Sequence, residues 1–244
     1  MLLWPSVRSI AYLDVMDKIN CFPTEIINMK NGFTVDDNLK NEWLKYGYND
    51  FINLEFDINR LLRNKLINST EIDKKDINSN EVIQAVKKLN NEYIIFTGGG
   101  ILRKDILSLG KKFIHIHPGV IPNHRGSTCF YYSLLENNSL GATAYIMNDQ
   151  IDSGEIIIQR KFSLNYFIKN DQSLFIDCIL DNYIRSHTLK DLIRLFNSRD
   201  YFETIVKDCS NVPYYIMHPL LRHVTLNKIN SNYSSLDNKG IIKN

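Results

Sequence analysis

The segment HIHPGVIPNHRG, residues 115–126, gathers side chains that can exchange protons or bind a metal ion. His115 and His117 are separated by one apolar residue, and on a β-strand such residues point to the same face. Further along, NDQIDSGE places Asp152 in a turn between two expected strands. Three interpretations stay open. The first is a zinc site with Asp152 or His124 as third ligand, the second is histidines that only complete a buried strand, and the third is a proton-handling His117 oriented by a carboxylate.

Three consecutive glycines, Gly98, Gly99 and Gly100, follow the apolar run YIIF at residues 93–96. Their spacing is not that of the GxGxxG motif, and no GKS or GKT follows, so a phosphate-binding loop is not indicated. Glycines at the carboxyl end of a strand let a ligand approach the backbone closely. The run therefore predicts either a pocket lined by backbone or a tight turn that requires positive φ.

Residues 81–117 follow the order helix, strand, glycine turn, helix, strand, which is typical of an open parallel α/β sheet. In such sheets ligands bind at the carboxyl ends of the strands, where His115 and His117 lie. The same patterns predict further elements. These are strands at 1–4, 24–29, 70–72, 142–147, 155–163 and 214–217, and helices at 9–17 with Ser9 as cap, 38–46, 58–66, 127–136 and 172–197.

The sequence thus predicts an α/β fold, an open, mostly parallel Rossmann-like sheet flanked by helices. We expect a catalytic domain over residues 1–165, a helical C-terminal extension over 166–230 and a flexible polar tail over 231–244. The aromatic and apolar stretch YYIMHPLLRH, residues 214–223, fits either core packing or a dimer contact.

The composition excludes several classes of partner. The 244 residues carry 29 Lys+Arg against 27 Asp+Glu, so the net charge of +2 favours neither nucleic acid nor an anionic membrane as partner. The four cysteines are widely spaced, which predicts reduced thiols rather than disulfides or a zinc knuckle. No apolar run of about 18 residues predicts a transmembrane helix, and MLLWPSVRS does not fit a signal peptide. We therefore expect a cytoplasmic protein.

Two segments, IHIHPGVIPNHRGS and YIMNDQIDSGEIIIQ, resemble the folate-dependent formyltransferases, in particular the sugar N-formyltransferases. That family shares Asn-x-His-Pro, then Leu-Pro, then Arg-Gly, and later Asp-x-Gly before a strand. The matching dipeptides and tripeptide here are, in order, His117-Pro118, Ile121-Pro122, Arg125-Gly126 and Asp152-Ser153-Gly154. The segment EYIIFTGGGILRKDIL also resembles the strand and turn that cradle the folate. The resemblance is best over residues 81–163.

The resemblance implies 10-formyltetrahydrofolate as formyl donor and no metal. The pteridine would lie against the backbone of Gly99, Gly100, Ile101 and Leu102, and the side chains of Ile101, Leu102 and Val120 would line its slot.

The resemblance also implies catalytic roles. The acceptor amine attacks the formyl carbon, His117 with help from His115 stabilises the tetrahedral oxyanion, and Asp152 holds an imidazole charged or takes the proton of the amine. One departure concerns His115, because the family has Asn at this position. A histidine can also donate a hydrogen bond to an oxyanion.

The expected acceptor is narrowed by two features of known family members that this sequence lacks. The glycine-containing loop that holds phosphate in purine-pathway members is replaced by WPSVRS, which argues against glycinamide ribonucleotide. The chain is short for a methionyl-tRNA formyltransferase and has no basic surplus for tRNA. The remaining familiar acceptor is a primary amine on a nucleotide-linked amino sugar, as used for lipopolysaccharide and other surface polysaccharides. Arg125, Arg8 and Tyr12 are expected near it, and a homodimer is an open alternative to a monomer.

Two other functions stay open. One is a hydrolase that releases formate from the same donor, with water in place of the amine. The other is a folate-binding or scaffold protein on a decayed catalytic core. The presence of His115 favours decay, whereas the retained His117, Asp152 and both glycine turns argue against it.

Overall fold

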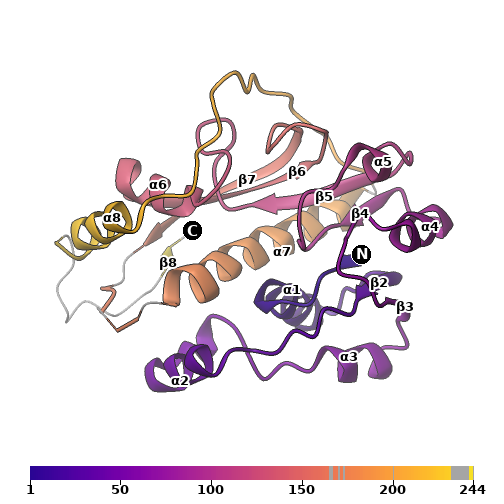
Figure 1. Cartoon of the computed structure of the whole chain (residues 1–244), viewed down its shortest axis with the longest axis horizontal. Coiled ribbons are helices and arrows are strands. Elements are labelled where there is room, and N and C mark those ends of the chain that lie inside the picture. Colours follow the sequence, from indigo (N-terminus) through magenta and orange to yellow (C-terminus); the bar gives the residue numbers. More distant parts are fainter. Residues whose placement is uncertain (165–166, 170, 173, 200, 232–241, 244) are drawn as a thin grey trace.

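A computed structural model describes residues 1–164, 167–169, 171–172, 174–199, 201–231 and 242–243, in which helices flank a twisted sheet (Figure 1). The strands are β1 (Leu2–Leu3), β2 (Glu25–Met29), β3 (Asn68–Ile72), β4 (Tyr93–Ile95), β5 (Lys112–His117), β6 (Ser139–Ile146), β7 (Glu155–Leu164) and β8 (Ile242–Lys243). The α-helices are α1 (Val7–Lys18), α2 (Asp37–Tyr46), α3 (Ile58–Asn64), α4 (Asn80–Lys88), α5 (Lys104–Leu107), α6 (Cys129–Asn137), α7 (Asp181–Arg199) and α8 (Pro219–Ser231). A 3-10 helix, η1, covers Tyr48–Asp50, and a π-helix, η2, covers Phe175–Leu180.

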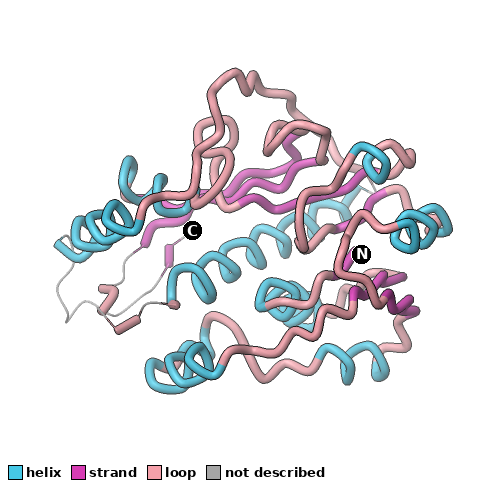
Figure 2. The backbone as a smooth tube through the Cα atoms, in the orientation of Figure 1, coloured by secondary structure: helices cyan, strands magenta, loops and turns pink. Residues whose placement is uncertain are grey.

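The strands form two ladders, β1-β2-β3 and β4-β5-β6-β7-β8. A parallel bridge between Leu2 and Phe96 joins them, and the Thr97 N–H donates to the Leu2 carbonyl at 3.2 Å. The resulting order is 3-2-1-4-5-6-7-8. Neighbouring strands from β3 to β5 run parallel, and β6, β7 and β8 are antiparallel to their neighbours. Figure 2 shows the strands in magenta and the helices around them in cyan. The predicted open, mostly parallel α/β sheet is confirmed.

Successive side chains of the central strands enter different apolar clusters on the two faces of the sheet. On β1, Leu3 packs in the cluster that contains α1 and α7, whereas Leu2 packs with α4 and α5. On β5, Ile114 joins the first cluster and Phe113 the second. Because both faces are covered, these strands are continuous apolar runs, as expected of buried parallel strands.

Helix α7 packs along β5, β6 and β7 and against α1, so part of the expected C-terminal extension covers the sheet (Figure 1). The boundary near residue 165 stays a prediction. Most of the expected tail, residues 232–241 and 244, lies outside the described residues, while β8 pairs with the end of β7.

Helix α1 begins earlier than the sequence suggested. Its cap is Ser6, whose Oγ accepts the N–H of Ser9 at 3.3 Å, so the prediction of Ser9 as cap is wrong. Ser9 lies inside the first turn, and its buried hydroxyl donates to the Trp4 carbonyl. Both serines precede an apolar helical pattern, but the chain turns directly after Pro5, which leaves Ser6 as the flanking residue.

A long connection between α7 and α8, residues 201–218, crosses the carboxyl edge of the sheet; we call it the strap (Figure 1). The predicted strand at 214–217 is reduced to one parallel bridge between Gly126 and Tyr214. Core packing of residues 214–223 is also wrong, since Tyr215 is 81% and Leu220 72% exposed while Met217 is buried. The strap is held by backbone hydrogen bonds to the loop after β5, which leaves most of its side chains outside.

Candidate active site

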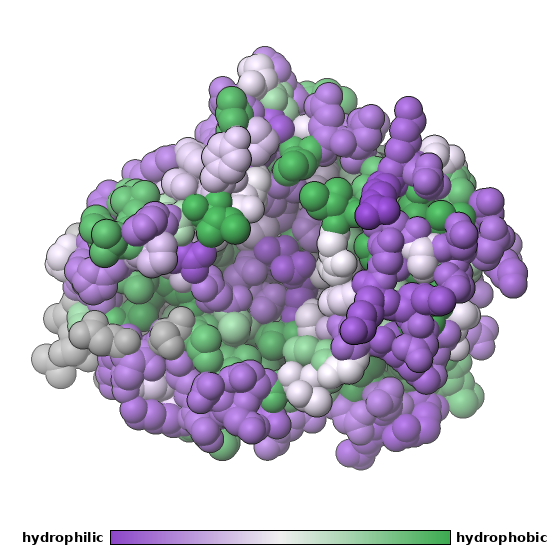
Figure 3. Space-filling view, in the orientation of Figure 1, coloured by the Kyte–Doolittle hydropathy of each residue, from purple (hydrophilic) through white to green (hydrophobic). Residues whose placement is uncertain are grey.

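A cavity of about 720 Å³ opens at the carboxyl edge of the central strands, and we call it the cleft. Its walls are the glycine turn (98–102), His115, Tyr145, the loop 147–152 and the strap at 212–216. On the face shown in Figure 3 the surface is hollowed near its middle, with polar residues inside the hollow. Placement at the carboxyl edge agrees with the rule for open α/β sheets.

A second cavity of about 430 Å³ adjoins the cleft, and we call it the side chamber. His117, Arg185 and Arg222 line the side chamber but not the cleft. Arg8, an expected acceptor contact, lines both, and so do His115 and Asp152. Of the three predicted catalytic side chains, these two therefore stand where the cavities meet.

Asp152 is fixed by three neighbours. Its Oδ2 accepts the N–H of Gly126 at 2.9 Å and lies 3.3 Å from Nδ1 of His117. Its Oδ1 accepts the hydroxyl of Tyr145 at 2.9 Å. Asp152 itself has φ of 47°, a left-handed conformation that aspartate tolerates better than most residues. The turn thus presents the carboxylate in one orientation.

His117 is 3% exposed, and both of its ring nitrogens face polar groups. Nε2 lies 2.9 Å from the carbonyl of His124, which can only accept, so Nε2 carries a proton. Nδ1 faces the carboxylate of Asp152. Burial lowers the pKa of His117, while the charge of Asp152 acts in the opposite direction. Nδ1 can donate to Asp152 only when the ring is protonated at both nitrogens.

His115 has a different environment. Its Nδ1 lies 3.4 Å from the Phe96 carbonyl, at the long end of hydrogen bonding, so either ring nitrogen can carry the proton of the neutral form. Burial, and then the positive charges of Arg185 and Arg8, hold the pKa of His115 well below its usual range. His115 is therefore neutral near pH 7.

This lowered pKa predicts a pH-dependent loss of stability. The unfolded chain binds a proton at His115 near pH 6.5, whereas the folded chain does not, so the free energy of unfolding falls as pH drops below 6.5. This group contributes at most about 1.4 kcal/mol per pH unit. Chemical denaturation at pH 7, 6 and 5 should show a shallower decline for His115→Asn than for the unmodified protein. If the free energy of unfolding fell equally steeply with pH in both proteins, His115 would not be the source of the pH dependence.

The glycine turn is both a tight turn with positive φ and a wall of the cleft. Gly98 and Gly99 have φ of 129° and 103°, so the turn requires the left-handed region. A Cβ on Gly99 would lie 2.4 Å from the ring of Trp4, and one on Gly98 would lie 3.0 Å from a guanidinium nitrogen of Arg8. The outer side of the turn, from Gly98 to Leu102, lines the cleft.

Three predicted contact residues lie outside both cavities. Val120 packs over Gly141, and Tyr12 is fully buried on α1. Arg125 donates to the carbonyls of Ile151, Cys209 and Asn211. Arg125 thus ties the strap to the loop of Asp152, and contacts of these three residues with ligands stay predictions.

Several residues of the site were not found by sequence reasoning. Tyr145 lies opposite His115 on the neighbouring strand β6, Arg185 and Arg222 come from α7 and α8, and the strap contributes Tyr214 and Ile216. None carries a local motif. Apart from Ile216, their one common signal is polar or aromatic character in segments that otherwise look structural.

Within the described ranges no group of three or more His, Cys, Asp or Glu side chains could hold a metal ion, so the zinc interpretation lacks a third ligand there. In the same ranges no helix combines the length and the apolar character needed to cross a membrane.

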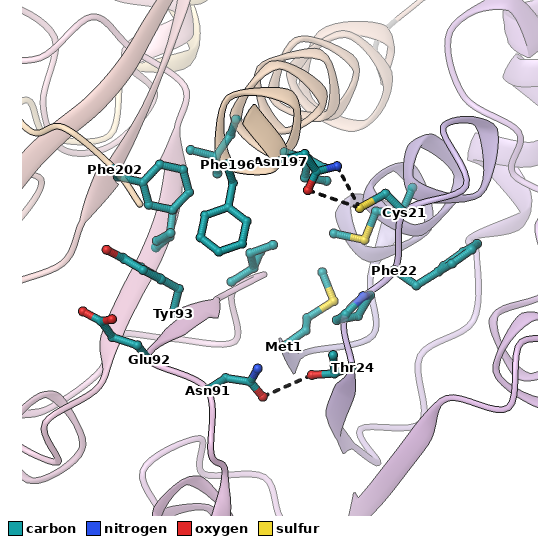
Figure 4. Close-up of a pocket in the computed structure, with 16 residues that line it drawn as sticks. Met1, Cys21, Phe22, Thr24, Asn91, Glu92, Tyr93, Phe196, Asn197 and Phe202 are labelled. Carbon is teal, nitrogen blue, oxygen red and sulfur yellow. Dashed lines mark hydrogen bonds between the residues drawn. The ribbon is translucent and has the colours of Figure 1, made fainter. Parts of the chain in front are cut away.

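Another cavity, of about 370 Å³, lies at the amino edge of the sheet (Figure 4). Its lining is mostly apolar, with Met1, Tyr93, Phe196 and Phe202 around it, and Asn91 bonded to Thr24. No histidine or aspartate lines it among the described residues. The predicted chemistry therefore belongs to the cleft and the side chamber.

Comparison with known proteins decides the family of the central segment. A family model described as formyl transferase matches residues 58–172, which contain the glycine turn, the histidine pair and Asp152. Residues 58–172 are of the formyl transferase family. The resemblance inferred from the sequence motifs is confirmed.

Curated relatives of this formyltransferase segment match over part of their length. The methionyl-tRNA formyltransferase of Ehrlichia ruminantium (strain Gardel) is 36% identical over 83 residues, 33% of this chain and 27% of that protein. The methionyl-tRNA formyltransferase of Finegoldia magna is 27% identical over 131 residues, 52% of this chain and 42% of that protein. The chain thus spans less than half the length of these relatives.

Solved formyltransferase structures share the fold. A sugar N-formyltransferase from Shewanella sp FDAARGOS_354 aligns with a TM-score of 0.53 at 14% identity, covering 92% of this chain and 84% of that one. Glycinamide ribonucleotide transformylase 1 from Symbiobacterium toebii aligns with a TM-score of 0.53 at 16% identity, covering 85% and 92%. The fold similarity therefore extends well beyond the matched segment.

Proposed function

We propose that this protein transfers a formyl group from 10-formyltetrahydrofolate to a primary amine. One observation carries the proposal: His115 and Asp152 stand where the cleft meets the side chamber. A donor in the cleft and an amine in the side chamber would meet beside these two side chains.

The cleft suits the donor. Its size falls within the range of small-molecule sites, and apolar surface dominates its walls. Gly99, Gly100, Ile101 and Leu102 form one wall, so the pteridine can approach backbone as the resemblance implies. The sugar 3N-formyl transferase WlaRD, which aligns with a TM-score of 0.50 at 13% identity, was crystallised in the presence of dTDP and 5-N-formyl-THF.

The reaction needs one proton acceptor and one oxyanion donor. The amine nitrogen bonds to the formyl carbon, whose carbonyl oxygen becomes an oxyanion, and Asp152 takes the proton of the amine directly or through a water. Collapse of the intermediate breaks the bond to N10 of the folate, which receives a proton. Neutral His115, in the tautomer with a proton on Nε2, donates to the oxyanion. The positive charges of Arg8 and Arg185 favour this neutral form of His115.

His117 receives a different role from the one its resemblance implied. Nε2 is bonded to the His124 carbonyl, so a proton on Nδ1 would place a second donor against Asp152, and we assign His117 the positioning of the carboxylate in that protonated form. The existence of a side chamber beside Asp152 favours an amine acceptor over water, and hence a transferase over a formate-releasing hydrolase.

Within this reaction we propose an amine on a nucleotide-linked amino sugar as acceptor, in the cytoplasm and for surface polysaccharide such as lipopolysaccharide. The support is the WPSVRS segment in place of a glycine-containing phosphate loop, with Trp4 packed on Gly99.

A calorimetric titration with a stable 10-formyltetrahydrofolate analogue tests the donor site. We expect about one analogue bound per chain. A charged substitution at the cleft wall, Ile101→Asp, should weaken binding strongly, whereas Asp105→Asn on the exposed side of α5 should not change it. No binding by the unmodified protein would overturn the proposed function.

A further inference from the structure

Arg8 is the one cation of the side chamber without an anionic partner in the described structure. It reaches from the first turn of α1 beneath Gly98, where its guanidinium donates to the Thr97 carbonyl at 2.9 Å. Its Nε is buried and makes no hydrogen bond, and no carboxylate of the described residues forms an ion pair with it.

The other two arginines of the side chamber are paired. Arg185 is buried, with Nε on Asp181 at 2.8 Å and a second nitrogen on the Ile116 carbonyl at 2.8 Å. Arg222 lies 3.2 Å from a carboxylate oxygen of Asp177. The carboxylate of the chamber itself, Asp152, is already engaged by Gly126, Tyr145 and His117.

A guanidinium with a buried Nε and no ion pair is costly, because it loses hydration and the charge of Asp181 offsets only part of that loss. Burial and the neighbouring Arg185 accordingly lower the pKa of Arg8 to about 10. One turn further along α1, the hydroxyl of Tyr12 is also buried without a partner. An anion beside Arg8 would remove the electrostatic part of this cost.

We propose that the side chamber holds an anionic group, a phosphate or a carboxylate, against Arg8 and Arg222, with Arg185 behind them. If the protein has the proposed function, the anion is part of the acceptor and lies in the same 430 Å³ space as the reacting amine. The assignment of the anion to the acceptor rests on that function. The acceptor would then carry its charge close to the amine, beside the junction with the cleft that Arg8, His115 and Asp152 line.

Calorimetric titration with inorganic phosphate and with acetate, at constant ionic strength, tests the subsite on the full chain. The unmodified protein is expected to bind at least one of them. Arg8→Gln and Arg222→Gln should each weaken binding by about tenfold or more, since a charge-assisted hydrogen bond is lost. The tighter of the two anions identifies the acceptor group as phosphate or carboxylate.

Arg194→Gln is the matched control, because Arg194 lies on the same helix as Arg185 with its side chain 63% exposed. Its anion affinity should equal that of the unmodified protein. Failure of both anions to bind, or equal binding by all four proteins, would overturn the subsite. Circular dichroism checks the fold, and Arg222→Gln, at a partly exposed position, keeps the test valid if Arg8→Gln unfolds.

Failure of the proposed function gives a different pattern. Anion binding that depends on Arg8 and Arg222, without binding of the folate analogue, would retain the subsite and remove its assignment to a formyl acceptor.

Discussion

Asp152→Asn is expected to reduce the rate of formyl transfer by about a hundred- to ten-thousandfold, the usual contribution of a positioned proton acceptor. Asparagine keeps the shape of the side chain and still accepts the Tyr145 hydroxyl, which bonds Oδ1 at 2.9 Å. It cannot take a proton from the amine. Single-turnover kinetics with saturating donor measure this step without the contribution of substrate release.

The donor affinity of Asp152→Asn should stay close to that of the unmodified protein, because the carboxylate contributes one edge of the cleft. Asp105→Asn, an exposed aspartate on α5 outside both cavities, serves as the control and should retain full activity. An unchanged rate in Asp152→Asn would mean that another group removes the proton.

His115→Ala is expected to lower the rate by about a hundred- to a thousandfold, which is typical for the loss of one oxyanion donor. His115→Asn should retain most of the activity, because an amide also donates a hydrogen bond. The contrast between alanine and asparagine separates hydrogen bonding from packing against Phe96 and Tyr145, which the ring of His115 contacts.

His223→Ala, an exposed histidine on α8, controls for effects of removing an imidazole elsewhere. If His115→Ala were as active as the unmodified protein, His115 would have no part in stabilising the oxyanion. The role assigned to His117 by the family pattern would then become the stronger hypothesis.

Much of the fold follows from local sequence patterns. The apolar runs around Tyr93 and Phe113, with glycines between them, fix two adjacent parallel strands and the turn that lines the cleft. The alternation of side chains on β5 likewise puts His115 and His117 at the carboxyl edge. Asp152 was identified from its place beside a Ser-Gly turn between two strands and from the Asp-x-Gly motif of the family resemblance.

Other parts of the site depend on contacts between distant segments. Arg185 reaches the carbonyl of Ile116, 69 positions away, and Arg125 bonds carbonyls of the strap more than 80 positions away. Helical periodicity places Arg185 on α7 but cannot indicate which strand end the helix crosses. The position of the strap could not be predicted either, because its apolar residues have the pattern of core residues. The backbone hydrogen bonds of Tyr214, which hold the strap across the opening of the cleft, leave no signal in the sequence.

The most direct test of the central claim is a mass-spectrometric assay of formyl transfer. The protein is incubated with 10-formyltetrahydrofolate carrying a ¹³C-labelled formyl group and a panel of nucleotide-linked amino sugars. We predict that one labelled formyl group appears on an acceptor amine and that Asp152→Asn forms far less product. Release of labelled formate at the same rate with and without acceptors, or no reaction of the donor at all, would contradict the account.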